Sequence, residues 1–129
     1  MIKDLEAAIG YRFKDITLLQ NALAHSSYAN ERWHDSLKSN ERLEFLGDSI
    51  LGMVTAEHLY RNFPDRPEGD LTRMRADMVC ERALAVVADR ICLGQHLLLG
   101  HGEATVSVSI ILFSGFVIKS EYSFSPLKC

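Results

Sequence analysis

The chain has 129 residues, of which 47% are hydrophobic and 24% charged, a composition typical of a globular domain and not of a disordered segment. One domain of this length can bury a proper hydrophobic core. The net charge of −3 gives no overall basic surface for a nucleic acid, so such a contact requires local basic groups or bridging metal ions. Three cysteines without CxxC spacing indicate neither a zinc site nor a disulfide framework, which fits a reducing cytoplasm.

The first thirty residues predict short helices. The apolar residues between positions 5 and 9 predict a helix that ends at Gly10, and Asp15 can cap a second helix. The stretch His25-Ser26-Ser27 that follows suggests a hydrolase, but the surroundings of a nucleophile elbow are absent. A hydrogen-bonded structural histidine near a helix end is the favoured interpretation.

The stretch from Asn40 to Ser49 carries the most informative pattern. Glu41, Glu44 and Asp48 stand at i, i+3 and i+7, so a helix places their carboxylates on one side. Three acids on one helical face can hold a hard cation such as Mg²⁺. A charged helix face is more often simply solvated, so the spacing by itself favours that plainer interpretation.

The bounds and the apolar side of this helix also follow from the sequence. Asn40 is a good N-cap, and Pro64 stops a helix that runs from about residue 41 towards residue 62. Gly52, inside this helix, suggests a close approach to the backbone there, as does Gly47. A core face is predicted from apolar residues at helical spacing, namely Leu43, Leu46, Ile50 and Val54.

The remaining chain predicts two more helices and then changes in character. Asp70 can cap a helix from residue 71 to about 79, a further helix covers residues 82–91, and Gly94 is its expected stop. Residues 105–110 alternate with period two and are rich in β-branched side chains, which favours a strand. The apolar run at 106–118 is too short to span a bilayer, which needs about 20 residues, so no membrane association is expected.

The string from Asn40 to Ser49, NERLEFLGDS, resembles the signature of the ribonuclease III family. Three further stretches agree in the same order, namely LAHSSYANE at 23–31, the segment from FP at 63–64 to EGDLTRMRA at 68–76, and LLLGHGE at 97–103. The resemblance covers roughly residues 2–104 and implies an all-α endonuclease domain over residues 1–104. It further implies a cytoplasmic homodimer that cuts double-stranded RNA in rRNA and mRNA processing. A purely structural helical domain with an incidental acidic face is disfavoured by four matching stretches.

The resemblance also implies roles for single residues. Glu41 and Asp48 correspond to catalytic acids that hold Mg²⁺, for which Mn²⁺ can substitute, and Glu68 corresponds to a third catalytic acid in the loop before the Asp70 helix. Carboxylate-held Mg²⁺ can activate a water and stabilise the leaving oxygen in phosphodiester hydrolysis. The duplex would be recognised by its A-form shape, its 2′-hydroxyls and its phosphates.

Four further residues are assigned to surfaces by the same resemblance. Glu44 and Phe45 are expected at the dimer interface, with Phe45 inserted into the second subunit. A plain core aromatic is the alternative for Phe45. Arg73 and Arg75 are expected to contact RNA phosphates, with a solvated or salt-bridged pair as the alternative.

The chain departs from the family pattern after Ala104. A helix that carries the second pair of metal-site acids is expected there, but residues 109–116 contain no acid. We therefore expect residues 105–129 to be a divergent tail, with no double-stranded-RNA-binding domain, and a frameshift or truncation is one hypothesis for it. Loss of the second acid pair predicts impaired catalysis. The alternative function is an inactive dimerisation or RNA-binding module of the same fold.

Overall fold

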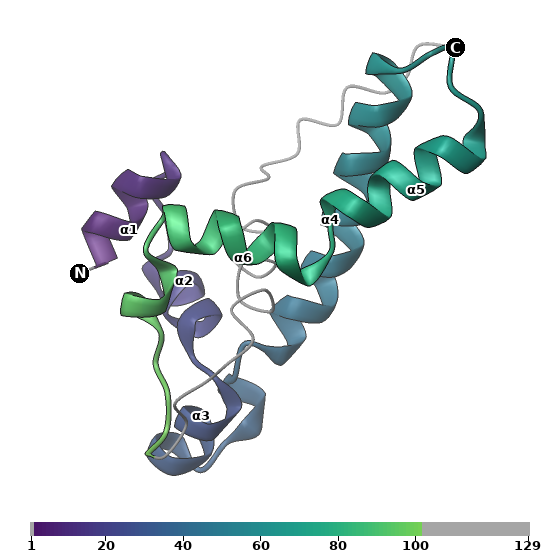
Figure 1. Cartoon of the computed structure of the whole chain (residues 1–129). Helices are drawn as coiled ribbons and strands as arrows, with labels where there is room; N and C mark the ends of the chain where they lie inside the picture. Colours follow the sequence, from purple (N-terminus) through teal and green to yellow (C-terminus); the bar gives the residue numbers. More distant parts are fainter. Residues whose placement is uncertain (1, 102–129) are drawn as a thin grey trace.

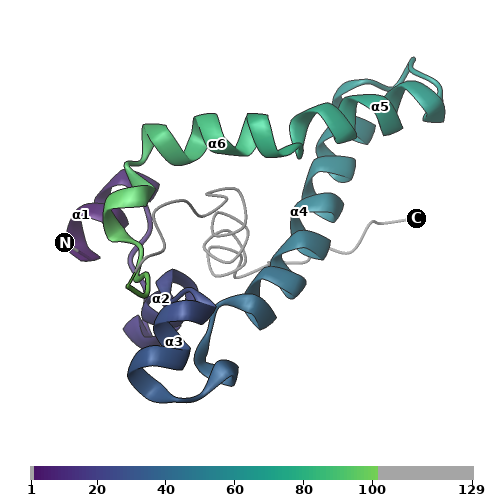
Figure 2. The ribbon, with the colours of Figure 1, turned by 60° about the horizontal axis from the view of Figure 1, so that its bottom comes forward.

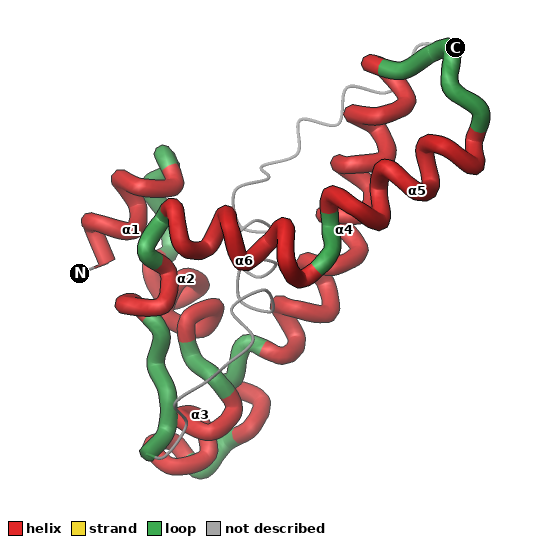
Figure 3. Tube along the Cα trace, viewed as in Figure 1, coloured by secondary structure: helices red, strands yellow, loops and turns green. Residues whose placement is uncertain are grey.

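The computed structural model describes residues 2–101 and forms an all-α fold in that part (Figures 1 and 3). The only pairing of β type within these residues is an isolated parallel bridge between Ala24 and Leu98. The predicted fold class is confirmed, whereas the strand expected at 105–110 lies outside the described residues. The helices are α1 Ile2–Ile9, α2 Ile16–Leu23, α3 Ser26–Trp33, η1 Ser36–Lys38, α4 Glu41–Asn62, α5 Glu68–Met78, α6 Glu81–Arg90 and η2 Leu93–His96.

The hydrophobic core joins the first helices to the end of the described chain. Its central members come from α1, α2, α6, η2 and the connection between α1 and α2, and partly buried apolar side chains pack around them. Complete burial of one such aliphatic side chain contributes roughly 1.5–3 kcal/mol. Short helices gain their stability from this packing, because isolated helices of eight residues are marginal in water. The buried cluster is Leu5, Phe13, Leu19, Leu23, Ala88 and Leu93.

The ends of the short helices follow local chemistry. Gly10 ends α1 in the left-handed region with φ +68°, and the Asp15 carboxylate accepts from the Thr17 N–H at the start of α2, so both predictions are confirmed. The stop predicted at Gly94 is wrong. The left-handed residue after α6 is Cys92 with φ 52°, and Gly94 lies within η2.

Helix α4 leaves this core. It has 22 residues, which correspond to about 33 Å at 1.5 Å per residue, and α5 packs beside it (Figures 1 and 2). Figure 2 shows α6 running from the α5 end of α4 back to α1. Within residues 2–101 no helix is long and apolar enough to cross a membrane.

The predicted core face of α4 is only partly correct. Leu43, Ile50 and Val54 are half-buried, but Leu46 is 48% exposed, and the fully buried positions are Gly47, Thr55 and Leu59. The physical reason is that apolar residues surround this helix instead of forming one stripe, so burial is spread over several sides. A methyl group added at Gly52 would meet no atom within 4 Å, so the close approach expected there is absent within the described part of the chain.

Helix α5 begins earlier than the sequence predicted. Its N-cap is Pro67, whose carbonyl accepts from the N–H of Asp70, so Asp70 lies in the first turn and is not the cap. Proline fits this place because its fixed φ and missing N–H lose nothing before the first helical turn. Glu68 is consequently the first residue of α5 and not a loop residue.

Candidate active site on helix α4

The start of α4 is fixed by Asn40, although not by the predicted cap. Asn40 already has helical angles, φ −75° and ψ −6°, and makes no side-chain capping bond. An N-cap side chain can bond to the first helical N–H groups only when its own backbone is extended, so the helical backbone of Asn40 explains why the predicted capping bond is absent. Asn40 is instead 1% exposed, and its backbone N–H donates to the carbonyl of Ala24 at 2.8 Å. Its side-chain amide donates to the carbonyl of Ala22 at 3.4 Å.

Three carboxylates lie together on α4 directly after Asn40. Glu41, Glu44 and Asp48 line one surface depression of about 420 Å³, together with Phe45 and Ser49. Glu41 and Asp48 are exposed, and Glu44 is half-buried. Burial raises the pKa of Glu44, and the negative charges of Glu41 and Asp48 raise it further. The charge of His25 acts in the opposite direction. The common acidic face predicted by the spacing is therefore present.

The carboxylate oxygens of this face are the type of ligand that a hard cation prefers. Mg²⁺ prefers carboxylate and water oxygens, and a cation between these side chains would relieve their mutual repulsion. In residues 2–101, however, no group of three or more acidic, histidine or cysteine side chains is arranged to hold a metal ion. Glu41, Glu44 and Asp48 share one depression but do not form such a group.

Phe45 lies at the rim of the acidic depression. Its side chain is 81% exposed, and so the alternative of a core aromatic is wrong for the isolated chain. A neighbouring depression, with Leu37, Leu46 and Asn21 among its residues, shares Phe45 and Glu41 with the acidic one. Large contiguous patches of exposed apolar side chains mark interaction surfaces, whereas single exposed apolar residues are normal.

Glu68 is not brought into the acidic depression. Figure 1 shows α5 beginning near the end of α4 that is remote from α1–α3, and Asp48 is roughly 20 Å along the helix axis from that end. The Glu68 carboxylate accepts a hydrogen bond from the hydroxyl of Thr72 at 2.5 Å. Within one chain, Glu68 and Asp48 are therefore separate features.

The two arginines lie on α5, and both are exposed. Arg73 forms an ion pair with Asp70 at 3.3 Å, and its Nε donates to the carbonyl of Gly69 at 3.4 Å. Exposed ion pairs of this kind contribute little to stability, about 0–1 kcal/mol. In the free chain Arg73 is thus salt-bridged, which is the alternative to its predicted contact with phosphate.

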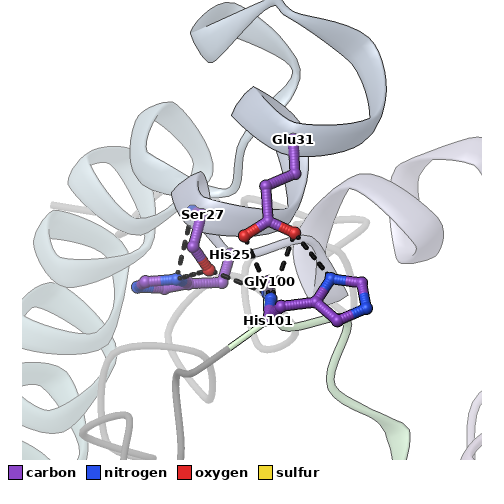
Figure 4. A network of polar contacts seen from close by, with 5 residues as sticks. All are labelled: His25, Ser27, Glu31, Gly100 and His101. Carbon is purple, nitrogen blue, oxygen red and sulfur yellow. Dashed lines mark hydrogen bonds and ion pairs between the residues drawn. The ribbon is translucent and has the colours of Figure 1, made fainter.

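A polar network closes the fold near α3 (Figure 4). His25 caps α3, with its Nδ1 accepting from the N–H of Ser27 and lying 2.8 Å from the Ser27 hydroxyl. The N–H of Gly100 donates to that hydroxyl at 2.9 Å, and the N–H of His101 donates to the Glu31 carboxylate at 3.0 Å. The structural interpretation of His25 is confirmed. Partners some seventy positions away explain why sequence periodicity missed Glu31 and His101.

Known proteins resemble this chain in sequence and in fold. The model of the Ribonuclease-III-like family matches residues 15–110. The chain belongs to the ribonuclease III family. Ribonuclease 3 of Symbiobacterium thermophilum is 56% identical over 97 residues, which are 75% of this chain and 40% of that protein. Ribonuclease 3 of Listeria monocytogenes is 43% identical over 101 residues, covering 78% and 44% respectively.

The fold is likewise that of a ribonuclease III nuclease domain. The nuclease domain of the Campylobacter jejuni enzyme superposes with a TM-score of 0.80 at 34% identity, covering 92% of this chain and 82% of that one. That structure is described as showing flexibility in a region involved in dimer formation. The chain spans less than half the length of the curated relatives that it matches. The resemblance inferred from four sequence stretches is confirmed.

Proposed function

We propose that this chain is derived from a Mg²⁺-dependent endonuclease of double-stranded RNA that acts as a homodimer. The observation that carries the proposal is the shared depression of Glu41, Glu44 and Asp48 on a helix of ribonuclease III type. Mg²⁺ would activate water and stabilise the leaving oxygen when bound. Family membership supports the reaction class, and the acids support the ion.

The residues of the chain have distinct parts in this proposal. Glu41 and Asp48 would bind the ion, and Glu44 joins them because it lies between them in the same depression. The raised pKa of Glu44 means that this carboxyl binds a proton more readily than an ordinary glutamate does. Glu68 is remote from Asp48 in its own chain, so its catalytic part requires the homodimer. Phe45 would bind the second subunit, and Arg73 and Arg75 the phosphates.

A second candidate is a catalytically inactive dimerisation or RNA-binding module. It is favoured by the incomplete ligand set of residues 2–101 and by the single acid, Glu121, after Ala104. In this case the exposed Phe45 surface keeps its role, and the acidic face no longer supports cleavage. The two candidates differ only in whether the ion is held well enough for catalysis.

Cleavage of a long RNA duplex by the full chain separates them. We expect slow cutting with Mg²⁺ and none with a chelator, and we expect the Glu41→Ala, Asp48→Ala double variant to cut nothing. Glu57→Ala is the matched control, because Glu57 is an exposed acid on α4 paired with Arg61 at 2.8 Å and lies outside the depression. A folded chain that binds duplex without cutting it, as judged by gel shift, would establish the inactive module instead.

A further inference from the structure

A reciprocal set of hydrogen bonds joins α2 to the segment before α4. Two of them come from Asn40, whose backbone N–H donates to Ala24 and whose amide donates to Ala22. Two come from Asn21, whose amide donates to the carbonyls of Lys38 at 2.5 Å and Ser39 at 3.3 Å. Each asparagine thus bonds to the backbone beside the other.

The segment Ala24–His25, whose Ala24 carbonyl accepts from Asn40, also forms backbone hydrogen bonds on its other side. Ala24 and His25 are extended, so successive carbonyls point in opposite directions. The carbonyl of Ala24 faces Asn40, while the carbonyl of Leu23 accepts from the N–H of Leu98 at 2.9 Å, and the N–H of His25 donates back to Leu98 at 3.0 Å. The joint between α2 and α3 is therefore a fixed support for the start of α4.

The acids follow directly from this support. Glu41 is the residue after Asn40, and the N–H of Glu44 donates to the Asn40 carbonyl at 2.8 Å, so the first turn of α4 is built on Asn40. Ser39 and Asn40 are almost completely buried, whereas Glu41 is exposed, so the chain passes from interior to acidic face within one residue. Asn21 also lines the depression that contains Glu41. A helix turns about 100° per residue, so small slippage at its start would redirect the carboxylates.

We propose that Asn21 and Asn40 are positioning residues that set the rotation of α4 and hence the arrangement of Glu41, Glu44 and Asp48. The functional meaning of this inference rests on the proposed metal-dependent activity. Ligating groups must be held to about 0.5 Å by supporting hydrogen bonds, and loss of such a support typically weakens metal binding by about 10–100-fold.

The test compares Asn21→Ala and Asn40→Ala in the full chain with Asn62→Ala. Asn62 is the matched control, because its amide donates to the carbonyl of His58 at 2.8 Å at the opposite end of the same helix. The three measurements are the pKa of Glu44 from an NMR titration, Mn²⁺ binding by electron paramagnetic resonance, and urea unfolding. Loss of a merely structural bond would lower stability but leave the Glu44 pKa of the folded variants unchanged.

We expect Asn21→Ala and Asn40→Ala to move the Glu44 pKa towards its ordinary value and to weaken Mn²⁺ binding by about 10-fold. Asn62→Ala should change neither. An unchanged Glu44 pKa in folded Asn21→Ala overturns the positioning role, and this variant decides the matter if Asn40→Ala fails to fold. If the unaltered chain binds no Mn²⁺ but the Glu44 pKa still responds, the positioning role stands and the proposed metal-dependent function fails.

Discussion

Replacing Glu44 by Gln tests the electrostatics of the acidic face. The raised pKa of Glu44 means that the folded chain binds a proton at this carboxyl more readily than the unfolded chain does. Stability is therefore unaffected below the ordinary glutamate pKa, falls as the pH rises through the folded pKa, and stays reduced above it. The neutral amide of Gln removes this penalty at neutral pH.

The size of the effect follows from the two neighbours on the helix. Like charges at i, i+3 and i, i+4 destabilise by about 0.2–0.5 kcal/mol each, and Glu44 has Glu41 and Asp48 at these spacings. Burial adds to this, while solvent screening of a half-exposed side chain reduces the sum. We expect Glu44→Gln to raise the free energy of unfolding by about 0.5–1 kcal/mol in chelator.

Urea unfolding with chelator and with Mg²⁺ measures this change. A ligand at a concentration of ten times its Kd stabilises the folded protein by about 1.4 kcal/mol. Mg²⁺ should therefore stabilise the unaltered chain more than Glu44→Gln. The difference in free energy of unfolding between the two chains should become smaller or change sign. Glu57→Gln is the control of opposite sign, because it breaks the pair with Arg61 and should lose about 0.3–0.5 kcal/mol. A Glu44→Gln variant less stable than the unaltered chain in chelator would contradict the repulsion argument.

Three further predictions concern the surroundings of the site. Gly100→Ala would place a methyl group 2.5 Å from Oε1 of Glu31 and should lower the free energy of unfolding by about 1–3 kcal/mol. The methyl group of Gly52→Ala would meet no atom within 4 Å, so this variant should be more stable by about 0.5–1 kcal/mol. Thermal unfolding of both variants checks these changes. Hydrogen bonds from His101 lower the pKa of Glu31, so the stability that Glu31 gives is present above the ordinary glutamate pKa and lost as the pH falls through the lowered one. Glu31→Gln should therefore unfold at lower urea than the unaltered chain near neutral pH, and the difference should vanish in acid. Phe45→Ala should remain folded, because its side chain is exposed, and should sediment as a monomer where the unaltered chain sediments as a dimer; equal masses would count against the proposed interface.

The sequence predicted what depends on local spacing. The helical class, the cap at Asp15, the stop at Gly10 and the common face of the acids on α4 are all set by residues a few positions apart, and the structure confirms them. The family resemblance rested on short strings and is confirmed by the comparisons. The roles assigned to single residues by that resemblance stay predictions.

What the sequence missed depends on distant partners. Asparagine is a preferred N-cap residue, but the side-chain amide and backbone N–H of Asn40 donate to the carbonyls of Ala22 and Ala24 instead. Helical periodicity in the sequence gives no information on these distant partners. The start of α5 was misplaced because Asp70 and Pro67 both suit a helix beginning, and a single sequence gives no ranking between them. The burial of α4 was overestimated because its apolar residues occupy several sides.

The network of Figure 4 has a consequence for how the chain folds. Its bonds from Gly100 to Ser27 and from His101 to Glu31 connect residues 73 and 70 positions apart. Closing a loop of that length carries an entropic penalty of roughly 4 kcal/mol from chain length alone, and contacts of long separation slow folding. The contacts of Ser27 and Glu31 with Gly100 and His101 are therefore expected to form late in folding, after α6 has returned the chain to α3. The support for α4 at Ala24 likewise depends on Leu98, whose backbone bonds to Leu23 and His25, so it needs nearly the whole described chain before it is complete.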